Sequence, residues 1–275
     1  MEDKNVTDQN VPDDDRYGSH EEFVQYYAQQ SETQETLERF QTIYDRVLRV
    51  VRGCGSNTTD LDILDVGCGA GTQSLLWAKD GFLVHGIDIN APLVELAKQR
   101  AENQHQKIDY RVGSATELPW DSESMDVCLV PELLEHVEEW KTCLDEFARV
   151  LKPGGVLFLS TNNKLCPKQQ EFNLPLYSWY PHPIKRHYEN LAVTSRPELV
   201  NYAKYPAVNW FTFFSLRDEF KKRGFSSMDR FDLAYSEHSR GVVGMALKLI
   251  RNSDVLRFFS HVATPYTLIV GIKER

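Results

Sequence analysis

The chain has 275 residues, 41% of them hydrophobic, which is enough to bury a core in one or two domains. Its formal net charge of −9 argues against non-specific nucleic-acid binding, which needs a basic face. The five cysteines form no C-x-x-C pair, and no apolar run reaches the roughly 18 residues that cross a bilayer. The first residues resemble neither a signal peptide nor a transit peptide, so we expect a cytoplasmic protein without a membrane span.

The N-terminal segment divides into a tail and a helix. Residues 1–18 are polar and acidic, with almost nothing apolar, which predicts a disordered tail. The following residues carry apolar side chains at three- and four-residue steps until two glycines interrupt them, which predicts a helix. We expect residues 19–58 to form a helical lid, in which Phe23, Tyr26 and Tyr27 close over a bound ligand.

Short apolar runs typical of strands then alternate with helical patterns. The runs lie at 61–67, 83–88, 109–114, 125–130 and 155–161, with helical patterns at 72–80, 92–103 and 140–152. This alternation predicts right-handed βαβ units in an α/β fold with a doubly wound, mostly parallel sheet. We assign residues 59–161 to the ligand-binding core of this fold.

Residues 162–211 break the pattern with six prolines, many aromatic residues and no clean periodicity. Long irregular insertions of this kind are often substrate loops, so we expect a substrate-cap insertion here. An aromatic and basic cluster in this cap could hold an aromatic ring, a sugar or an anionic group. Its members are Tyr177, Trp179, Tyr180, His182, Lys185, Arg186, His187 and Tyr188.

Residues 212–275 are expected to complete the fold. The patterns predict a helix over 215–225, a strand over 227–236 and a final strand over 264–274. The stretch 241–259 is expected to be helical in part.

The stretch LDVGCGAGTQS, residues 64–74, indicates a ligand-binding turn. Gly67, Gly69 and Gly71 follow the first strand, where glycine permits positive φ and leaves room for a ligand against the backbone. Asp88 ends the second strand about twenty residues on, where an acid can accept both hydroxyls of a ribose. Together these residues predict an adenosine-type ligand.

The spacing of the glycines and the presence of one acid narrow the class of ligand further. A dinucleotide site has G-x-G-x-x-G, but this chain has G-x-G-x-G, and no G-K-[ST] of a phosphate-binding loop follows. Asp65, expected at the mouth of the turn, would repel a pyrophosphate but suits a cation. S-adenosylmethionine carries an adenosine, a sulfonium and an ammonium group without a phosphate, and it therefore fits.

The segments LDVGCGAGTQS, GSATELPW, PELLEHVEEW and LKPGGVLFLST, in this order and with Asp88 between the first two, resemble the class I S-adenosylmethionine-dependent methyltransferases. The resemblance covers about residues 60–161 and implies a Rossmann-like, seven-stranded sheet. The E-x-x-E-H run at 132–136 is most similar to the ubiquinone-biosynthesis O-methyltransferase group. The same run occurs in small-RNA 3′-end 2′-O-methyltransferases.

The resemblance also implies which residues hold S-adenosylmethionine. The glycine turn would flank its methionine part and Asp65 its ammonium group, while Asp88 would hold the ribose and Ile89 would pack on the adenine. Ser114 stands where many family members place an aspartate that accepts from the adenine amino group. The implied cofactor-binding residues are Asp65, Gly67, Cys68, Gly69, Gly71, Asp88, Ile89, Ser114, Ala115, Thr116 and Pro131.

Glu132, Glu135 and His136 are the predicted catalytic residues. Methyl transfer to a hydroxyl requires removal of its proton, and a histidine has a suitable pKa. Alternatively, the three side chains would share one helix face at i, i+3 and i+4 and could hold a divalent metal. The resembling RNA enzymes add a downstream histidine as a metal ligand, where this chain has Asn209. We therefore favour His136 as a base and assign no metal ligand.

The leading hypothesis is a methyltransferase that acts on a hydroxyl of a small molecule, such as a phenol or a sugar. The alternatives are a methyltransferase directed at an RNA ribose or at a nitrogen, and a non-catalytic protein that binds S-adenosylmethionine. The acidic composition and the lack of an RNA-binding module favour a small-molecule acceptor over nucleic acid.

Overall fold

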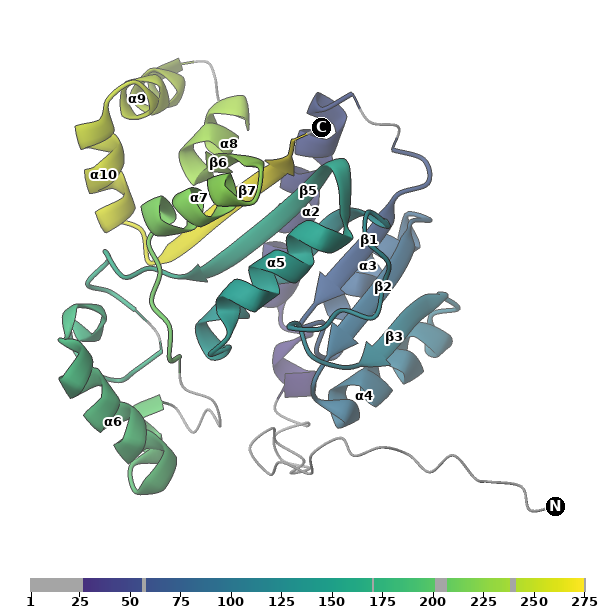
Figure 1. Cartoon of the computed structure of the whole chain (residues 1–275), viewed down its shortest axis with the longest axis horizontal. Helices are drawn as coiled ribbons and strands as arrows, with labels where there is room; N and C mark the ends of the chain where they lie inside the picture. The colour runs from purple at the N-terminus through teal and green to yellow at the C-terminus, as the bar shows by residue number, and fades with distance from the viewer. Residues whose placement is uncertain (1–26, 56–57, 170, 201–206, 238–240, 275) are drawn as a thin grey trace.

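A computed structural model of the chain describes residues 27–55, 58–169, 171–200, 207–237 and 241–274 (Figure 1). The predicted tail lies outside the described residues, as do Phe23 and Tyr26 of the predicted lid. Within the described part, no helix is long and apolar enough to cross a bilayer.

Seven strands of the described residues form one sheet, in the order β3-β2-β1-β4-β5-β7-β6. They are β1 (Asp62–Val66), β2 (Leu83–Asp88), β3 (Ile108–Val112), β4 (Met125–Pro131), β5 (Leu151–Asn162), β6 (Phe225–Asp229) and β7 (Tyr266–Lys273). Strands β1 to β5 pair in parallel, and β7 runs antiparallel to both β5 and β6. The predicted doubly wound, mostly parallel α/β sheet is confirmed.

Helices cover both faces of this sheet (Figure 1). On one face pack α2 (Gln34–Gly53), α3 (Thr72–Lys79) and α8 (Arg230–Glu237), and on the other α5 (Trp140–Val150) and α7 (Phe213–Lys222). The helix α4 (Ala91–Asn103) packs against β3. Side chains of β1 alternate between the layers, because Ile63 joins the cluster of α2 and Leu64 joins that of α5.

The strand order reverses direction between β1 and β4. In open parallel sheets such a switch point leaves a crevice at the carboxyl ends of the strands, where ligands bind. The glycine turn follows β1, and the E-x-x-E-H run follows β4. The topology therefore brings the two predicted parts of the site to the same edge of the sheet.

The N-terminal helix is interrupted, whereas the sequence predicts one continuous helix. Residues 27–30 are helical, a turn follows, and α2 begins after Thr33. The Thr33 hydroxyl accepts the backbone N–H of Thr36, which caps the new helix.

The cap insertion, expected to be irregular, contains a helix of thirteen residues, α6 (His182–Thr194), between two short 3-10 helices, η3 (Tyr177–Trp179) and η4 (Pro197–Val200). Pro181 precedes α6 and Pro183 is its second residue. Proline is well tolerated at these positions, because their N–H groups have no intrahelical partner. The prolines that obscure the helical periodicity thus lie where α6 begins.

The strand predicted over 227–236 is wrong beyond Asp229, because α8 begins at the next residue. The Asp229 carboxylate accepts the N–H of Asp232, and the Asp232 carboxylate accepts the N–H of Asp229. This reciprocal pair is a capping box, which starts a helix. An acid three residues after another acid was the sequence signal for it.

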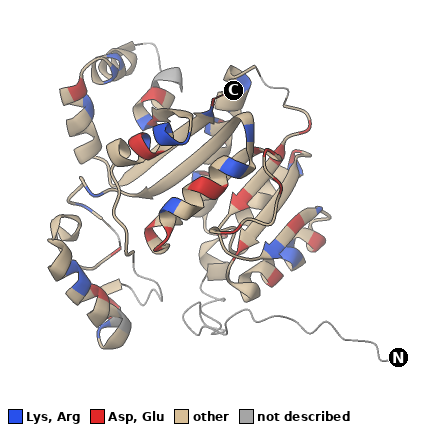
Figure 2. Cartoon of the chain, viewed as in Figure 1, with Lys and Arg blue, Asp and Glu red and all other residues tan. Residues whose placement is uncertain are grey.

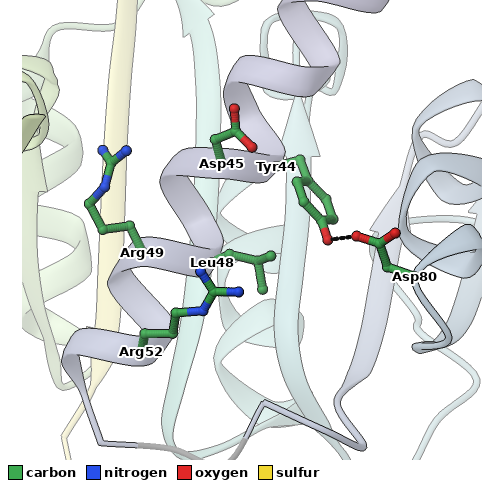
Figure 3. Close-up of a pocket in the computed structure, with 6 residues that line it drawn as sticks. All are labelled: Tyr44, Asp45, Leu48, Arg49, Arg52 and Asp80. Atoms are coloured by element: carbon green, nitrogen blue, oxygen red, sulfur yellow. Dashed lines mark hydrogen bonds between the residues drawn. The ribbon is translucent and has the colours of Figure 1, made fainter.

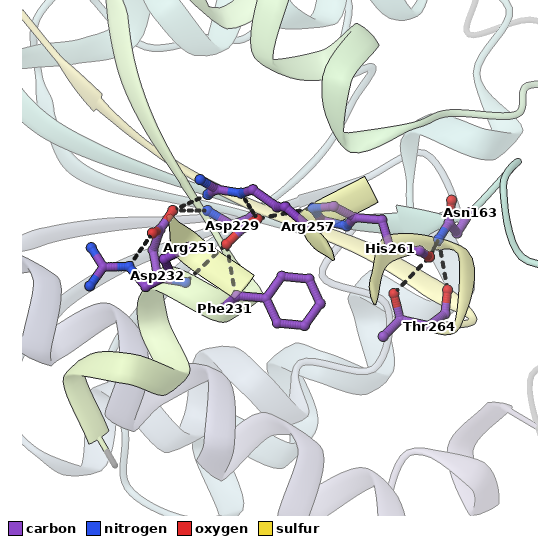
Figure 4. A network of polar contacts seen from close by, with 8 residues as sticks. All are labelled: Asn163, Asp229, Phe231, Asp232, Arg251, Arg257, His261 and Thr264. Carbon is purple, nitrogen blue, oxygen red and sulfur yellow. Dashed lines mark hydrogen bonds and ion pairs between the residues drawn. The ribbon is translucent and has the colours of Figure 1, made fainter. Parts of the chain in front are cut away.

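The expected partly helical stretch forms two helices, α9 (Gly241–Arg251) and α10 (Asp254–Val262). A buried network holds α10 to the end of β6 (Figure 4). One Asp229 oxygen contacts the His261 ring nitrogen at 2.9 Å and accepts from Arg257 at 2.7 Å. The outer faces of the two helices expose large apolar side chains, among them Val242 and Phe259.

Candidate functional site

The turn at the carboxyl end of β1 requires glycine at three positions. Gly67, Gly69 and Gly71 have φ angles of 74°, 49° and 77°. A Cβ on Gly71 would lie 2.3 Å from the Tyr110 hydroxyl oxygen, whereas a Cβ on Gly69 would meet no atom within 4 Å. The turn is therefore packed against the protein at Gly71 and open at Gly69, which leaves backbone accessible to a ligand.

The carboxylate of Asp88 braces this turn from the end of β2. Its Oδ2 accepts the N–H of Gly69 at 2.9 Å, and its Oδ1 accepts the N–H of Asn90 at 2.8 Å. A carboxylate oxygen has a second lone pair, so Asp88 can still accept from ligand hydroxyls. The adjacent Ile89 is 43% exposed and offers an apolar surface beside the acid.

The sequence predicts Asp65 at the open mouth of the turn. In the structure, its side chain is instead buried beneath the turn. Its side chain is 1% exposed, and its Oδ2 accepts the Ser74 hydroxyl at 2.6 Å. Burial raises the pKa of Asp65 to about 7. Among the described residues, no cationic side chain forms an ion pair with it.

Gln73 is a buried polar residue of this region that the sequence analysis missed. It lies in the first turn of α3, directly after the glycine turn, and is 2% exposed. Both its amide nitrogen and its amide oxygen lack hydrogen-bond partners among the described residues. Each such group costs about 1–3 kcal/mol when buried, which a ligand could offset. Its place after three glycines was the only sequence signal.

The loop after β3 holds its own hydroxyl groups together. The Ser114 Oγ lies 2.7 Å from the Thr116 Oγ1 and accepts the N–H of Thr116 at 3.1 Å. Ala115 packs against the main core. The predicted contact of Ser114 with adenine stays a prediction.

Arg100 links the N-terminal segment to the glycine turn. From α4 its guanidinium donates to the carbonyl of Ala70 at 3.2 Å, to the Ser31 hydroxyl at 2.9 Å and to the carbonyl of Ala28 at 3.0 Å. Residues 28–31 thus lie beside the predicted cofactor site, and Tyr27 next to them is 44% exposed. This location is consistent with the predicted lid.

The predicted catalytic residues do not share one helix face. Glu132 has a left-handed backbone with φ of 51° and pairs with Arg39 of α2, while Leu134–His136 form a single 3-10 turn, η2. Glu135 is 1% exposed, accepts the Thr161 hydroxyl at 2.8 Å and has a pKa raised to about 8 by burial. His136 is exposed at the surface.

The helix face that the metal alternative assumes for Glu132, Glu135 and His136 is therefore not formed. In the described part of the chain, no group of three or more His, Cys, Asp or Glu side chains converges as metal ligands would. Glu135 is directed into the protein at Thr161, whereas His136 is on the surface. The three side chains thus have separate environments, and each has to be tested on its own.

Asn209 holds the turn that carries Glu135 and His136. Its side-chain amide donates to the carbonyls of Leu134 and Val137, at 3.0 and 2.6 Å. Its backbone N–H donates to the carbonyl of Glu135 at 3.0 Å. Where the resembling enzymes place a histidine ligand, this chain thus has an amide that clamps the η2 turn.

Comparison with known proteins identifies the core of the chain. Residues 64–159 match the family model described as a methyltransferase domain. These residues are therefore similar to a methyltransferase domain. The chain is 40% identical over 102 residues to the ubiquinone biosynthesis O-methyltransferase of Coxiella burnetii, and 35% identical over 114 residues to that of Pelagibacter ubique. These alignments cover 37% and 42% of this chain, and 44% and 47% of the relatives, so the chain spans less than half of the relatives' length.

Solved structures resemble this chain over most of its length and not only over residues 64–159. The PH0226 protein of Pyrococcus horikoshii OT3 is 17% identical with a TM-score of 0.56, covering 91% of this chain and 99% of that one. A Haemonchus contortus phosphoethanolamine N-methyltransferase 2, solved with S-adenosyl-L-methionine, is 16% identical with a TM-score of 0.53, covering 92% and 60%. The chain thus has the Rossmann-like fold of class I S-adenosylmethionine-dependent methyltransferases.

A surface pocket lies away from the edge of the sheet that carries the glycine turn. Its lining residues are Tyr44, Asp45, Leu48, Arg49, Arg52 and Asp80 (Figure 3). Asp80 follows α3 and precedes β2, so the pocket lies near the amino ends of the strands. The tyrosine hydroxyl hydrogen-bonds to Asp80 across it. We assign it no part in the site.

The cap places its predicted cluster in two environments. Tyr177 and Lys185 are buried, at 0% and 6% exposed. His182, Arg186 and His187 are exposed on α6. Of the predicted cluster, Tyr177 and Lys185 are therefore the side chains that could contact a bound molecule away from water.

Proposed function

We propose that this protein transfers a methyl group from S-adenosylmethionine to a hydroxyl of a small organic acceptor, such as a phenol or a sugar. The observation that carries the proposal is the glycine turn with its open backbone at Gly69, braced by Asp88 above the buried acid Asp65. These groups suit an adenosine with a nearby positive charge. The O-methyltransferase relatives support oxygen as the atom methylated.

The residues at the turn fit the cofactor part by part. The backbone of Gly67 to Gly71 would flank its methionine portion, with Asp65 as the counter-charge of its ammonium group. Asp88 would accept from the ribose hydroxyls, and the exposed face of Ile89 would pack on the adenine. The buried amide of Gln73 is available for the polar end of the methionine portion, since it lacks partners among the described residues.

The chain's task in the reaction is alignment and removal of one proton. The cofactor supplies a methyl carbon that its sulfonium already activates for displacement. His136 accepts the proton of the acceptor hydroxyl, because an imidazole is the side chain best suited to act as a general base near neutral pH. Glu135, with its pKa raised to about 8, keeps its proton at neutral pH and supports the turn through Thr161. The cap excludes water from the acceptor.

RNA as the acceptor has less support. Figure 2 shows Lys and Arg interspersed with Asp and Glu along the described helices and strands. Nucleic-acid binding needs basic side chains gathered on one face. A divalent metal also has less support, because Asn209 donates to backbone carbonyls and Glu135 keeps its proton at neutral pH.

Two measurements test the proposal. Calorimetry should show binding of S-adenosylmethionine and of its demethylated product, with no binding of NAD. A screen with methyl-labelled cofactor against phenols, sugars, amines and short RNAs should label a hydroxyl of a phenol or sugar. Tight NAD binding without S-adenosylmethionine binding would overturn the cofactor assignment. Cofactor binding with no transfer to any of these classes would favour a non-catalytic binding protein.

A further inference from the structure

The cap holds a lysine amine in an unusual environment. Lys185 of α6 is 6% exposed, and its Nζ lies 3.9 Å from the ring centroid of Trp210 and 5.4 Å from that of Tyr177. Aromatic faces attract a cation without neutralising it. The amine thus lies against two aromatic rings with its charge available.

Lys185 forms no direct ion pair among the described residues, although the carboxylate of Glu189 on the same helix favours its charge. No carboxylate there lies within ion-pair distance of its Nζ, and no acceptor hydrogen-bonds to it. Burial and the nearby Lys164 lower the pKa of Lys185 to about 8, which Glu189 on the same helix offsets only in part. A buried charge without a hydrogen-bond partner costs free energy. An anionic ligand that bound to the Lys185 amine would offset this cost.

A second donor next to the amine is also without a partner. The indole Nε1–H of Trp210 is buried and has no acceptor in the described part of the chain. Trp210 follows Asn209, whose amide clamps the turn of Glu135 and His136. Lys185 and Trp210 are thus joined through one residue to the loop that carries the proposed base.

We propose that Lys185 and the rings of Trp210 and Tyr177 form a subsite for an anionic group of the acceptor, a carboxylate or a phosphate. This inference rests on the proposed function only in naming the ligand as the methyl acceptor. An anionic oxygen replaces the water that the amine loses on burial and forms a charge-assisted hydrogen bond with it. The exposed cations of α6 remain hydrated and give little discrimination.

The test uses the melting temperature of the full chain with small anions as probes. Sodium benzoate, phenyl phosphate and neutral benzyl alcohol are each added at 20 mM, with ionic strength held constant by NaCl. For a Kd near 1 mM, linkage predicts that at least one of the two anions raises the wild-type melting temperature by about 3–6 °C, with no rise from benzyl alcohol. The anion that gives the larger shift identifies carboxylate or phosphate.

Two variants locate the effect. Lys185→Met should abolish the anion-induced shift, and its melting temperature without ligand should equal or exceed that of the wild type, because a poorly solvated charge is removed. Arg186→Met removes one positive charge from the adjacent, exposed position of α6 and should keep the full shift. The wild-type shift should also fall above about pH 8, as the amine loses its proton beside Lys164 and Glu189.

Three results would overturn the subsite. They are no shift with either anion, an equal shift in Lys185→Met, and a marked fall in the melting temperature of unliganded Lys185→Met, which would assign the amine to the packing of the cap. The anion titration contains no S-adenosylmethionine, and cofactor binding is measured separately by calorimetry. Loss of cofactor binding therefore counts against the proposed function, whereas loss of the anion shift counts against the subsite alone.

Discussion

The proposed cofactor side and the proposed cap side of the site each bury an ionisable side chain that forms no direct ion pair among the described residues. Asp65 lies under the glycine turn with its pKa raised to about 7, and Lys185 lies in the cap with its pKa lowered to about 8. Burial is the largest cause of both shifts, and it disfavours the charged form in each case. In both regions, the buried group lowers the stability of the unliganded protein at the place where we expect a ligand group of opposite charge to bind.

The two regions differ in how they hold these charges. On the cofactor side, the neighbours of Asp65 are a short turn and the first turn of α3, all within ten residues of sequence. In the cap, Lys185 meets Trp210, twenty-five residues further along the chain, and Tyr177. A local turn suits a cofactor that many enzymes share, whereas a site assembled from distant segments can change with the acceptor.

The largest effect is expected at the loop that separates the two regions. His136→Ala should slow turnover about 10²–10⁴-fold with cofactor binding unchanged, because a positioned base contributes about that much. His187→Ala, an exposed histidine of the cap, is the matched control and should retain most activity. Steady-state kinetics with and without EDTA would check this. A chelator-sensitive enzyme in which both glutamates are as essential as His136 would instead establish a metal site.

The next effect belongs to the cofactor side alone. Asp88→Ala should weaken S-adenosylmethionine binding by roughly 2–4 kcal/mol, since hydrogen bonds between a charged group and the ribose hydroxyls are lost. The loss of the bond to the Gly69 N–H should loosen the turn as well. Calorimetry measures the change, with Glu95→Ala on exposed α4 surface as the control. Unchanged affinity would place the ribose elsewhere.

The glycine turn offers a comparison within itself. Gly71→Ala should lower the free energy of unfolding by about 2–4 kcal/mol, because its Cβ would clash with the Tyr110 hydroxyl at a positive φ. Gly69→Ala meets no neighbouring atom, so it should cost about 1 kcal/mol from its φ of 49°. Urea denaturation separates the two. Equal costs would mean that backbone strain alone, and not packing, requires these glycines.

Sequence reasoning succeeded where a structure depends on neighbours in the chain. The parallel strands, the glycine turn and the position of Asp88 follow from periodicity and short spacings, and the structure has this arrangement. The helix face expected for the E-x-x-E-H run failed, because Glu132 adopts a left-handed backbone and Asn209 clamps the following turn. A contact across more than seventy residues leaves no local periodicity in the sequence.

The burial of Lys185 and its contacts with aromatic rings likewise could not be predicted from local sequence patterns. The sequence indicated eight aromatic and basic residues of the cap without ranking them, since their burial is decided by how α6 packs on the segment before α7. The Trp210 ring that contacts Lys185 was not in that group. In contrast, the acid that caps α8 was readable from its spacing and was missed only because apolar alternation dominated the interpretation.

The last predicted effect tests whether Asp65 lowers the stability of the cofactor-free protein in order to bind a cation. In the unfolded chain its pKa is near the ordinary value of 3.8, and in the fold it is about 7, so the stability that it contributes below pH 4 is lost as the pH rises to 7. Asp65→Asn should therefore raise the free energy of unfolding of the cofactor-free protein at pH 8, on the order of 1–3 kcal/mol, with little change at pH 4. Urea denaturation at the two pH values measures the gain, and calorimetry should show weaker cofactor binding in the same variant. A variant that is destabilised at pH 8 would show that Asp65 serves the fold through Ser74, and the parallel with Lys185 would then fail.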